Sequence, residues 1–202
     1  MKTVVLILIL GAVGHFGIAF ADDAPIDGGR SADGRLEVRF ARTPNYDPYK
    51  DGSEYNFQLQ SNEPRRVLLT INGCGFRNYN ISKGLCNVIW SKSGRFVAIC
   101  ERDSRHTTQI YIVGVRDSEA WQLEFPDYVQ NALGRVDATA VDFACITKLD
   151  HWDNDKLYIE LNFTANGRKN YTCMVTLQCV LEDHSSPRIG PMTVAQPTEL
   201  ER

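Results

Sequence analysis

The amino-acid sequence predicts an all-β protein composed of three antiparallel sheets and one short helix. Apolar and polar residues alternate with a period of two in many short segments, which is typical of half-buried strands. Clusters of Gly, Pro, Asn and Asp separate these segments, as expected for turns. In addition, the sequence SADGR at residues 31–35 returns as SKSGR at residues 91–95. A turn repeated between alternating segments indicates a repeated sheet unit.

The N-terminus has the pattern of a secretory signal peptide at residues 1–21. Lys2 precedes an apolar run at residues 4–10, and the small-residue motif at residues 19–21 precedes the acidic Asp22. The alternative is an uncleaved membrane anchor, but glycines interrupt the apolar run, which is shorter than the roughly 20 residues that span a bilayer. We therefore expect a secreted or periplasmic protein with no membrane contact after cleavage.

The first unit follows a segment without periodicity. Residues 22–34 are expected to form a flexible leader to a β-rich domain at residues 35–183. Alternation at residues 36–41, 55–60 and 67–71 predicts three strands with turns between them.

The second unit repeats this plan, with strands expected at residues 88–90, 95–102, 109–115 and 120–125. Successive side chains of a strand point to opposite faces, and residues 96–100 are apolar on both faces. Such a strand is covered on both sides. The pattern therefore favours stacked or radially packed sheets over a single sheet that faces water.

The one predicted helix lies at residues 127–135, with Asp127 as its N-cap and Gly134 at its C-terminal stop. A third unit of strands follows it. Residues 184–202 are rich in Pro and polar residues, and we expect a disordered tail there. The elements of the third unit are, in order, a strand at 141–146, a turn at 153–155, a strand at 156–163, a hairpin at Asn166-Gly167 and a strand at 170–182.

Residues 88–127 read VIWSKSGRFVAICERDSRHTTQIYIVGVRDSEAWQLEFPD. They combine an apolar-apolar-Trp-Ser run, a Gly-Arg turn, a strand, a polar loop, a second strand around Tyr111, a turn and a last strand. This segment resembles the WD40-like repeat of TolB-type and prolyl-peptidase-type β-propellers. The resemblance implies that the second unit is a propeller blade and that residues 31–35 begin another.

Three units are fewer than the four to eight blades that close a propeller. We therefore expect three blade-like antiparallel sheets that pack as an incomplete propeller or in a β-sandwich-like manner. Alternatively, the chain forms a homo-oligomer that completes a ring. The resemblance supplies no catalytic residue, because chemistry in such proteins resides in another domain.

The six cysteines permit disulfides in an exported protein. Cys74 and Cys86 flank a short loop, and a bridge between them would contribute about 3 kcal/mol in the chain-entropy model. The sequence leaves this bridge and two reduced thiols as equal alternatives. Cys173 and Cys179 would lie about 20 Å apart on one strand, so they cannot pair with each other.

Three segments partly match reactive motifs, and each has a simpler interpretation. Residues 29–33 approach a nucleophile elbow, but they lead into a strand and end in Asp, so Ser31 is interpreted as a turn serine. Residues 47–58 lack two ligands of an EF-hand, which leaves a looser calcium site as the alternative to a solvated loop. The acidic residues 150–155 fit turn chemistry better than metal binding.

A Cys100–His106 pair lacks a third orienting group, so a buried thiol and a loop histidine are the simpler interpretation. The sequence therefore predicts no catalytic, cofactor-binding or metal-binding residue.

The net charge of −3 and the lack of a basic cluster argue against nucleic acid as a partner. The leading hypothesis is an exported non-catalytic β-repeat protein that contacts a protein or glycan in a cell envelope. We expect the contact surface in loops, at residues 45–53 and 73–84. The alternative is a small secreted hydrolase that uses Asp47, Asp51 and residues 150–155.

Overall fold

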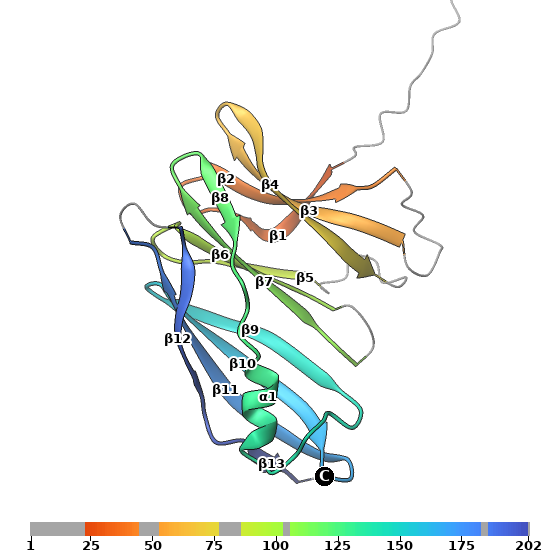
Figure 1. Cartoon of the computed structure of the whole chain (residues 1–202). Coiled ribbons are helices and arrows are strands. Elements are labelled where there is room, and N and C mark those ends of the chain that lie inside the picture. The colour runs from red at the N-terminus through yellow and green to blue at the C-terminus, as the bar shows by residue number, and fades with distance from the viewer. Residues whose placement is uncertain (1–22, 45–52, 77–85, 103–105, 183–185, 202) are drawn as a thin grey trace, which may run out of the picture.

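The computed structural model describes residues 23–44, 53–76, 86–102, 106–182 and 186–201, and for residues 23–24, 53–54 and 72–76 it describes the backbone alone (Figure 1). It contains three antiparallel sheets, A, B and C, each a meander from an inner to an outer strand. Within these described residues, the arrangement confirms the predicted all-β class with three blade-like sheets and one short helix. Sheet A holds β1 (Asp23–Arg30), β2 (Leu36–Arg42), β3 (Ser53–Asn62) and β4 (Arg65–Phe76); sheet B holds β5 (Cys86–Trp90), β6 (Phe96–Glu101), β7 (Gln109–Arg116) and β8 (Glu119–Gln122); sheet C holds β9 (Cys145–Asp153), β10 (Lys156–Ala165), β11 (Lys169–Val180), β12 (Arg188–Val194) and β13 (Thr198–Leu200).

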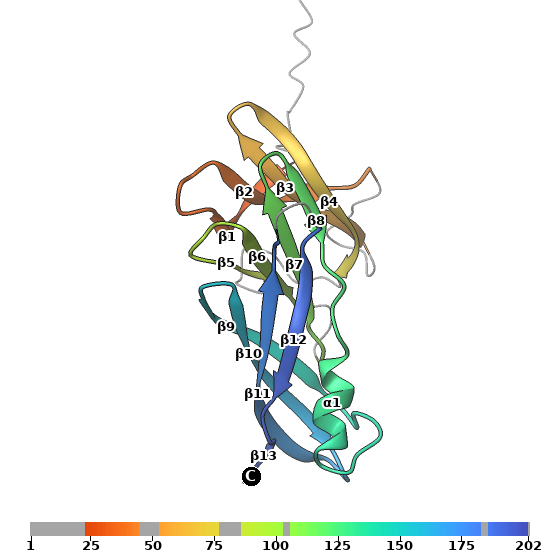
Figure 2. The same cartoon turned by 60° about the vertical axis from the view of Figure 1, so that its left-hand side comes forward.

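Sheet B lies between the other two, as Figures 1 and 2 show from two sides. Val97 and Ile99 of β6 pack into the core shared with sheet A. Phe96 and Ala98 of the same strand pack into the core shared with sheet C. Every residue of β6 is buried, which confirms the expectation that this strand is covered on both faces.

The inner strands are joined by two equivalent tryptophan hydrogen bonds. Trp90, at the end of β5, donates from Nε1 to the carbonyl oxygen of Gly29 on β1 at 2.9 Å. Trp152, near the end of β9, donates from Nε1 to the carbonyl oxygen of Ile89 on β5 at 3.2 Å. Each tryptophan thus ties its own sheet to the inner strand of the preceding sheet.

The two serine-to-arginine turns have the same geometry. In each, the serine hydroxyl accepts a hydrogen bond from the amide five residues further on, at 3.0 Å for Ser31 and 3.1 Å for Ser91. The glycine amide donates to the serine carbonyl oxygen at 2.9 Å in both turns. Gly34 and Gly94 have φ of 71° and 68°, a conformation that glycine adopts without steric cost. The repeated sequence therefore marks the first hairpin of sheets A and B.

The prediction of a flexible leader at residues 22–34 is wrong, because this segment contains strand β1 and the first turn. Ile26 is buried in the core between sheets A and B. A Cβ at Gly28 would lie 2.3 Å from the Val88 carbonyl oxygen, and one at Gly29 would lie 2.5 Å from that of Val38. The two glycines therefore allow β1 to approach its neighbours closely, where the sequence pattern indicated flexibility.

The prediction of a disordered tail at residues 184–202 is also wrong, because β12 and β13 in this segment pair with β11. Val194 is buried in the core of sheet C. Pro187 is also buried and lies over Gly114 of sheet B, where a Cβ would meet its ring at 2.5 Å. Pro191 lies in the edge strand β12, where a missing backbone N–H is tolerated.

The helix α1 (Tyr128–Gly134) matches its prediction, since the Asp127 side chain accepts a hydrogen bond from the Gln130 amide at 2.9 Å. The turn at Asn154 and the hairpin at Asn166 and Gly167 are also confirmed, and all three residues have positive φ. Among the described residues no helix is long and apolar enough to cross a membrane.

Candidate functional site: a cleft between the turn ends of sheets A and B

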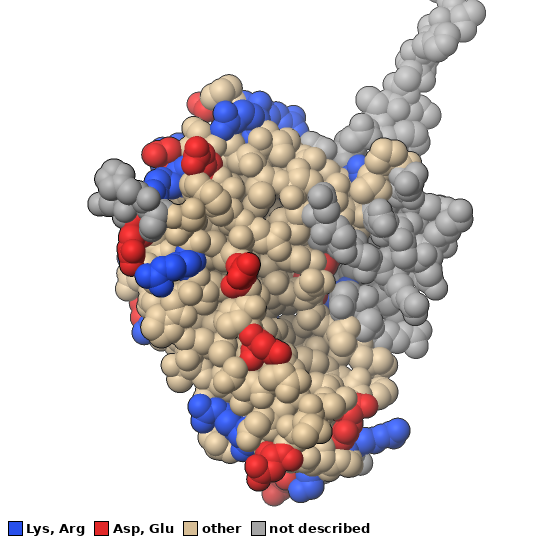
Figure 3. All heavy atoms as spheres, in the orientation of Figure 1, with Lys and Arg blue, Asp and Glu red and all other residues tan. Residues whose placement is uncertain are grey.

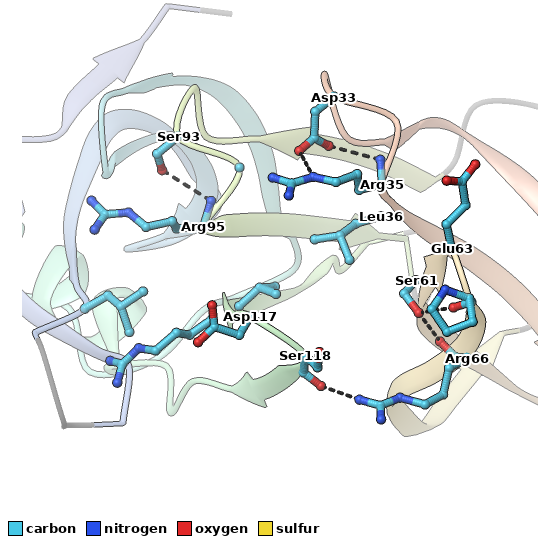
Figure 4. Close-up of a pocket in the computed structure, with 15 residues that line it drawn as sticks. Asp33, Arg35, Leu36, Ser61, Glu63, Arg66, Ser93, Arg95, Asp117 and Ser118 are labelled. Atoms are coloured by element: carbon cyan, nitrogen blue, oxygen red, sulfur yellow. Dashed lines mark hydrogen bonds and ion pairs between the residues drawn. The ribbon is translucent and has the colours of Figure 1, made fainter.

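A cleft of about 470 Å³ opens where the hairpins of sheets A and B meet (Figure 4). Four turns contribute to it, namely β1–β2, β3–β4, β5–β6 and β7–β8, and Leu181 after β11 completes the wall. In the orientation of Figure 1 these turns point toward the top and the left of the molecule. The lining residues are Asp33, Arg35, Leu36, Ser61, Glu63, Pro64, Arg66, Ser93, Gly94, Arg95, Val115, Arg116, Asp117, Ser118 and Leu181.

Charged and apolar groups share the lining. It carries four arginines against three carboxylates, while Leu36, Val115 and Leu181 supply an apolar part. On the face drawn in Figure 3, charged side chains gather at the top, along the left edge and at the bottom, whereas the middle is mostly uncharged. The cleft therefore lies at the turn ends of sheets A and B and combines charged hydrogen-bond donors with apolar side chains.

Asp33 holds Arg35 within the first turn. The Asp33 carboxylate accepts hydrogen bonds from the Arg35 amide at 3.0 Å, from the Ser31 hydroxyl at 2.8 Å and from Arg35 Nε at 2.6 Å. The backbone bond from Arg35, followed by the bonds from Ser31 and from the guanidinium, lowers the pKa of Asp33 from its ordinary 3.8 to about 2. Asp33 is therefore ionised throughout the physiological pH range and holds the Nε end of the Arg35 guanidinium in place.

Two further arginines connect chain segments around the cleft. Arg66 of β4 donates from Nη2 to the carbonyl oxygen of Ser118 at 2.6 Å and so reaches from sheet A to sheet B. Arg116 donates from Nη2 to the Glu182 carbonyl oxygen at 2.6 Å, which ties β7 to the segment after β11. Both bonds join segments that are distant in sequence, so the walls of the cleft are fixed by tertiary contacts.

Arg95 leaves its own turn and binds the next sheet. Its guanidinium donates to one oxygen of Asp155 in the β9–β10 turn, and the Ser93 hydroxyl donates to the other oxygen at 2.8 Å. This ion pair differs from the one in the first turn, because position 93 is Ser where position 33 is Asp.

A second cavity, of about 530 Å³, lies beside the inner strands and contains Asp27, Cys86, Cys100, Arg102 and Lys148 in its lining. Cys86 lies opposite Glu101 and Cys100 opposite Asn87 in the β5–β6 register, so the two thiols belong to opposite faces of sheet B. The cavity thus holds no thiol pair formed by these two cysteines.

The structure places several sequence-predicted candidates in structural roles. Ser31 is buried and hydrogen-bonded within its turn, as expected of a turn serine. Cys100 Sγ contacts the Thr147 carbonyl oxygen at 3.4 Å, while the His106 ring packs on Phe143 with centroids 4.1 Å apart. Residues 45–52 and 77–85, which include Asp47, Asp51 and most of both predicted contact loops, lie outside the described residues.

The acidic segment 150–155 is divided between different contacts. Asp150 pairs with His151 at 2.9 Å, and Asp155 binds Ser93 and Arg95 of sheet B. Within the part of the chain that the structure describes, no three His, Cys, Asp or Glu side chains gather as a metal site would require.

The proposed Cys74–Cys86 bridge remains a prediction, because the side chain of Cys74 lies outside those described. Cys173 and Cys179 are both buried on β11 and lie on the same strand, which agrees with the prediction that they do not pair with each other. Burial raises the pKa of both thiols, to about 12 for Cys179.

Two features were missed by sequence reasoning. One is the buried Glu101, whose carboxyl group accepts hydrogen bonds from Tyr55 of sheet A and, at 2.9 Å, from Tyr111 of sheet B. The other is the cleft itself, although the arginine that ends each repeated turn, Arg35 and Arg95, was a visible signal for it.

In comparisons with known proteins, no family model, curated protein or solved structure matches this chain.

Proposed function

We propose that this chain is an exported, non-catalytic binding protein that contacts a protein or glycan partner in a cell envelope through the cleft between sheets A and B. The observation that carries the proposal is the convergence of four hairpins from two sheets around one open cavity whose lining combines arginines, hydroxyls and apolar side chains (Figure 4). Pockets that combine apolar walls with a few fixed polar groups are the usual form of a binding site.

The polar groups of the cleft are suited to holding a ligand more than to moving protons. A general base works best with a pKa near the operating pH, whereas the pKa of Asp33 is about 2. Ser31 gives its hydroxyl to the turn, so it is not poised as a nucleophile. The arginine side chains, by contrast, present several N–H donors each and stay charged.

The scaffold favours precise placement of these donors. The turns that carry them are hairpins of sheets whose core faces are buried on both sides of sheet B. Sites built on rigid strands hold geometry better than sites on long loops. Export and the envelope location rest on the sequence pattern of residues 1–21, which lie outside the described residues.

The hydrolase alternative has less support from the described residues. Of its candidates, Asp155 is bound by Ser93 and Arg95, and Asp150 pairs with the exposed His151. Asp155 is therefore placed to join sheets B and C.

Site-directed photo-crosslinking tests the proposal. A photo-reactive amino acid is placed at Ser118, an exposed cleft residue whose contact to Arg66 uses the backbone carbonyl. The purified mature chain is then mixed with the exported proteins and glycans of the source cell and irradiated. Ala140, exposed in the loop beyond α1, provides the matched control. We expect a discrete adduct from position 118 and none from position 140; equal labelling from both positions, or none from position 118, would count against the cleft.

A further inference from the structure

The turn of sheet B already binds a carboxylate, and this shows how the turn sequence recognises one. Ser93 donates from Oγ to one oxygen of Asp155 at 2.8 Å, and Arg95 donates from Nη2 to the other. Asp155 belongs to the next sheet, and its side chain is 16% exposed. A serine and an arginine two residues apart on the turn thus hold both oxygens of a carboxylate that arrives from outside the sheet.

The equivalent turn of sheet A faces open space at the corresponding place. Arg35 occupies the position of Arg95, and the two turns share their backbone hydrogen bonds. Across the cleft from Arg35 lies the tip of the next turn, formed by Ser93 and Gly94, neither of which carries a carboxyl group. A Cβ on Gly94 would meet no atom within 4 Å. The cleft beside the turn of sheet A therefore occupies the position that Asp155 of sheet C fills beside the turn of sheet B.

Arg35 has donors left for such a group. Asp33 engages its Nε and its backbone amide, while the side chain as a whole is 82% exposed. A guanidinium carries N–H donors on three nitrogens, so the two terminal nitrogens can bind a second carboxylate. On the facing wall, Arg66 uses Nη2 for the Ser118 carbonyl oxygen and adds positive charge to the same cleft (Figure 4).

We propose that the cleft binds a carboxylate side chain on an acidic peptide segment of a protein partner, with Arg35 acting toward it as Arg95 acts toward Asp155. This inference rests on the proposed binding function, because it names the ligand of the same cleft. A peptide fits better than a glycan, since Leu36, Val115 and Leu181 can accept aliphatic side chains next to the carboxylate. None of the described lining residues is aromatic, so the cleft offers no ring on which a sugar would stack.

Peptide titration of the mature chain, followed by NMR, tests the recognition. The probes are acetyl-Leu-Asp-Leu-amide, its isostere acetyl-Leu-Asn-Leu-amide, and a trimer of galacturonic acid as the carbohydrate source of the same group. The Arg35 Nε–H signal and the Gly34 and Ser118 amide signals report binding. We expect the Asp peptide to shift these signals and the Asn peptide to leave them in place.

Variants of the turn make the test specific. Arg35→Gln should weaken Asp-peptide binding by about tenfold or more, because a hydrogen-bonded charge pair is lost. Arg42→Gln, at the other end of strand β2, should leave it unchanged. Asp33→Ser copies the arrangement at Ser93, which keeps the turn contacts to Ser91 and to the Arg95 amide, so it should fold and bind the Asp peptide about tenfold more tightly.

The possible results distinguish failure of the carboxylate inference from failure of the proposed binding function. Equal binding of the Asp and Asn peptides, or no loss in Arg35→Gln, would refute the carboxylate proposal, and a crosslinked adduct at position 118 would then leave the binding function standing. Tighter binding of the uronate trimer than of the Asp peptide would overturn the peptide assignment. A preference for Asp without any adduct would count against the function alone.

Discussion

At the scale of single residues, positions 33 and 93 decide where the turn arginines go. Asp33 forms an ion pair with Arg35 within its own turn, at 2.6 Å. Ser93 lacks the charge for such a pair, and Arg95 binds Asp155 on the next sheet instead. One side chain in an otherwise equivalent turn thus separates an arginine that faces a cleft from one that joins two sheets.

The pKa of Asp33 gives a direct prediction. Because the Ser31 hydroxyl is one of the groups that lower it to about 2, Ser31→Ala should raise the Asp33 pKa toward 3.8. The folded-state pKa lies below the unfolded value, so the stability that Asp33 contributes is present above about pH 4 and is lost as the pH falls toward 2. A carboxyl carbon NMR titration measures both proteins, with Ser118→Ala as the control that should leave the Asp33 curve in place.

The buried Glu101 supports a second prediction. Tyr111→Phe removes the hydroxyl that donates to the Glu101 carboxyl group at 2.9 Å, and the buried acceptor loses that bond without gaining water. We expect the free energy of unfolding to fall by about 1 to 3 kcal/mol. Urea denaturation provides the measurement.

Tyr158→Phe is the matched control for this substitution. Tyr158 is half-buried on the outward face of sheet C, where its ring stacks on His151 with centroids 4.4 Å apart. Loss of its hydroxyl should change stability by less than about 0.5 kcal/mol. Equal losses from the two tyrosines would show that the Tyr111–Glu101 hydrogen bond within sheet B does not stabilise the fold.

At the scale of elements, the sheets depend on close approach of the inner strands. Gly28→Ala and Gly94→Ala both place a side chain at positive φ, 74° and 68°, at a cost of about 1 kcal/mol each. The Cβ at Gly28 would also lie 2.3 Å from the Val88 carbonyl oxygen on β5, whereas the Cβ at Gly94 would meet nothing within 4 Å.

Gly28→Ala should therefore lower the free energy of unfolding by about 3 kcal/mol or more, and Gly94→Ala by about 1 kcal/mol. Because the two positions share the backbone cost, their difference measures the packing of β1 against β5. Urea denaturation followed by tryptophan fluorescence compares the variants. Similar losses would mean that β1 can move away from β5 at little cost.

The elements also show how far sequence could predict the fold. Strands with strict alternation, such as β10, and turns with a left-handed residue, such as Asn154, were predictable because the cause is local. The inner strand β1 was not predictable, because glycines such as Gly28 and Gly29 occur both in flexible segments and in strands that approach a neighbouring backbone closely. Strand β12 was missed for a similar reason, because Pro191 is equally compatible with disorder and with a sheet edge.

The candidate site was less predictable than the fold. The turn arginines Arg35 and Arg95 were visible in the sequence, but their separation across a cleft depends on the stacking of sheets A and B. Arg66 belongs to no motif, and its contact to Ser118 crosses 52 positions of sequence. Such contacts are set by long-range packing, which periodicity does not report.

At the scale of the whole molecule, both ends of the sheet stack are polar. Glu37 and Arg39 form an ion pair on the outward face of sheet A, next to Gln58 on β3. Asn162 lies opposite Thr172 on the outward face of sheet C. Sheet B, by contrast, is apolar on both faces.

The tryptophan contacts between successive sheets also stop at sheet A. Trp90 at the end of β5 and Trp152 near the end of β9 lie close to the first turns of sheets B and C, and each reaches back to the preceding sheet. In sheet A the residue before the turn is Arg30. Sheet A therefore lacks the indole donor that would join it to a sheet before it.

From these polar ends we expect a monomer instead of a ring completed by several chains. A ring would cover the outward faces of sheets A and C. The side chains of Glu37 and Arg39 are already only 18% and 19% exposed, so the main cost falls on sheet C, where burying the Asn162 amide without new partners is unfavourable. Light scattering coupled to size-exclusion chromatography should give the mass of a single chain at all concentrations tested. Asn162→Leu combined with Thr172→Leu would place two apolar side chains directly opposite each other on the outward face, and this variant should self-associate. A defined oligomer of the unaltered chain, dissociated by charge substitutions at Glu37 or Glu160, would show that these polar faces are interfaces and that the stack continues from one chain to the next.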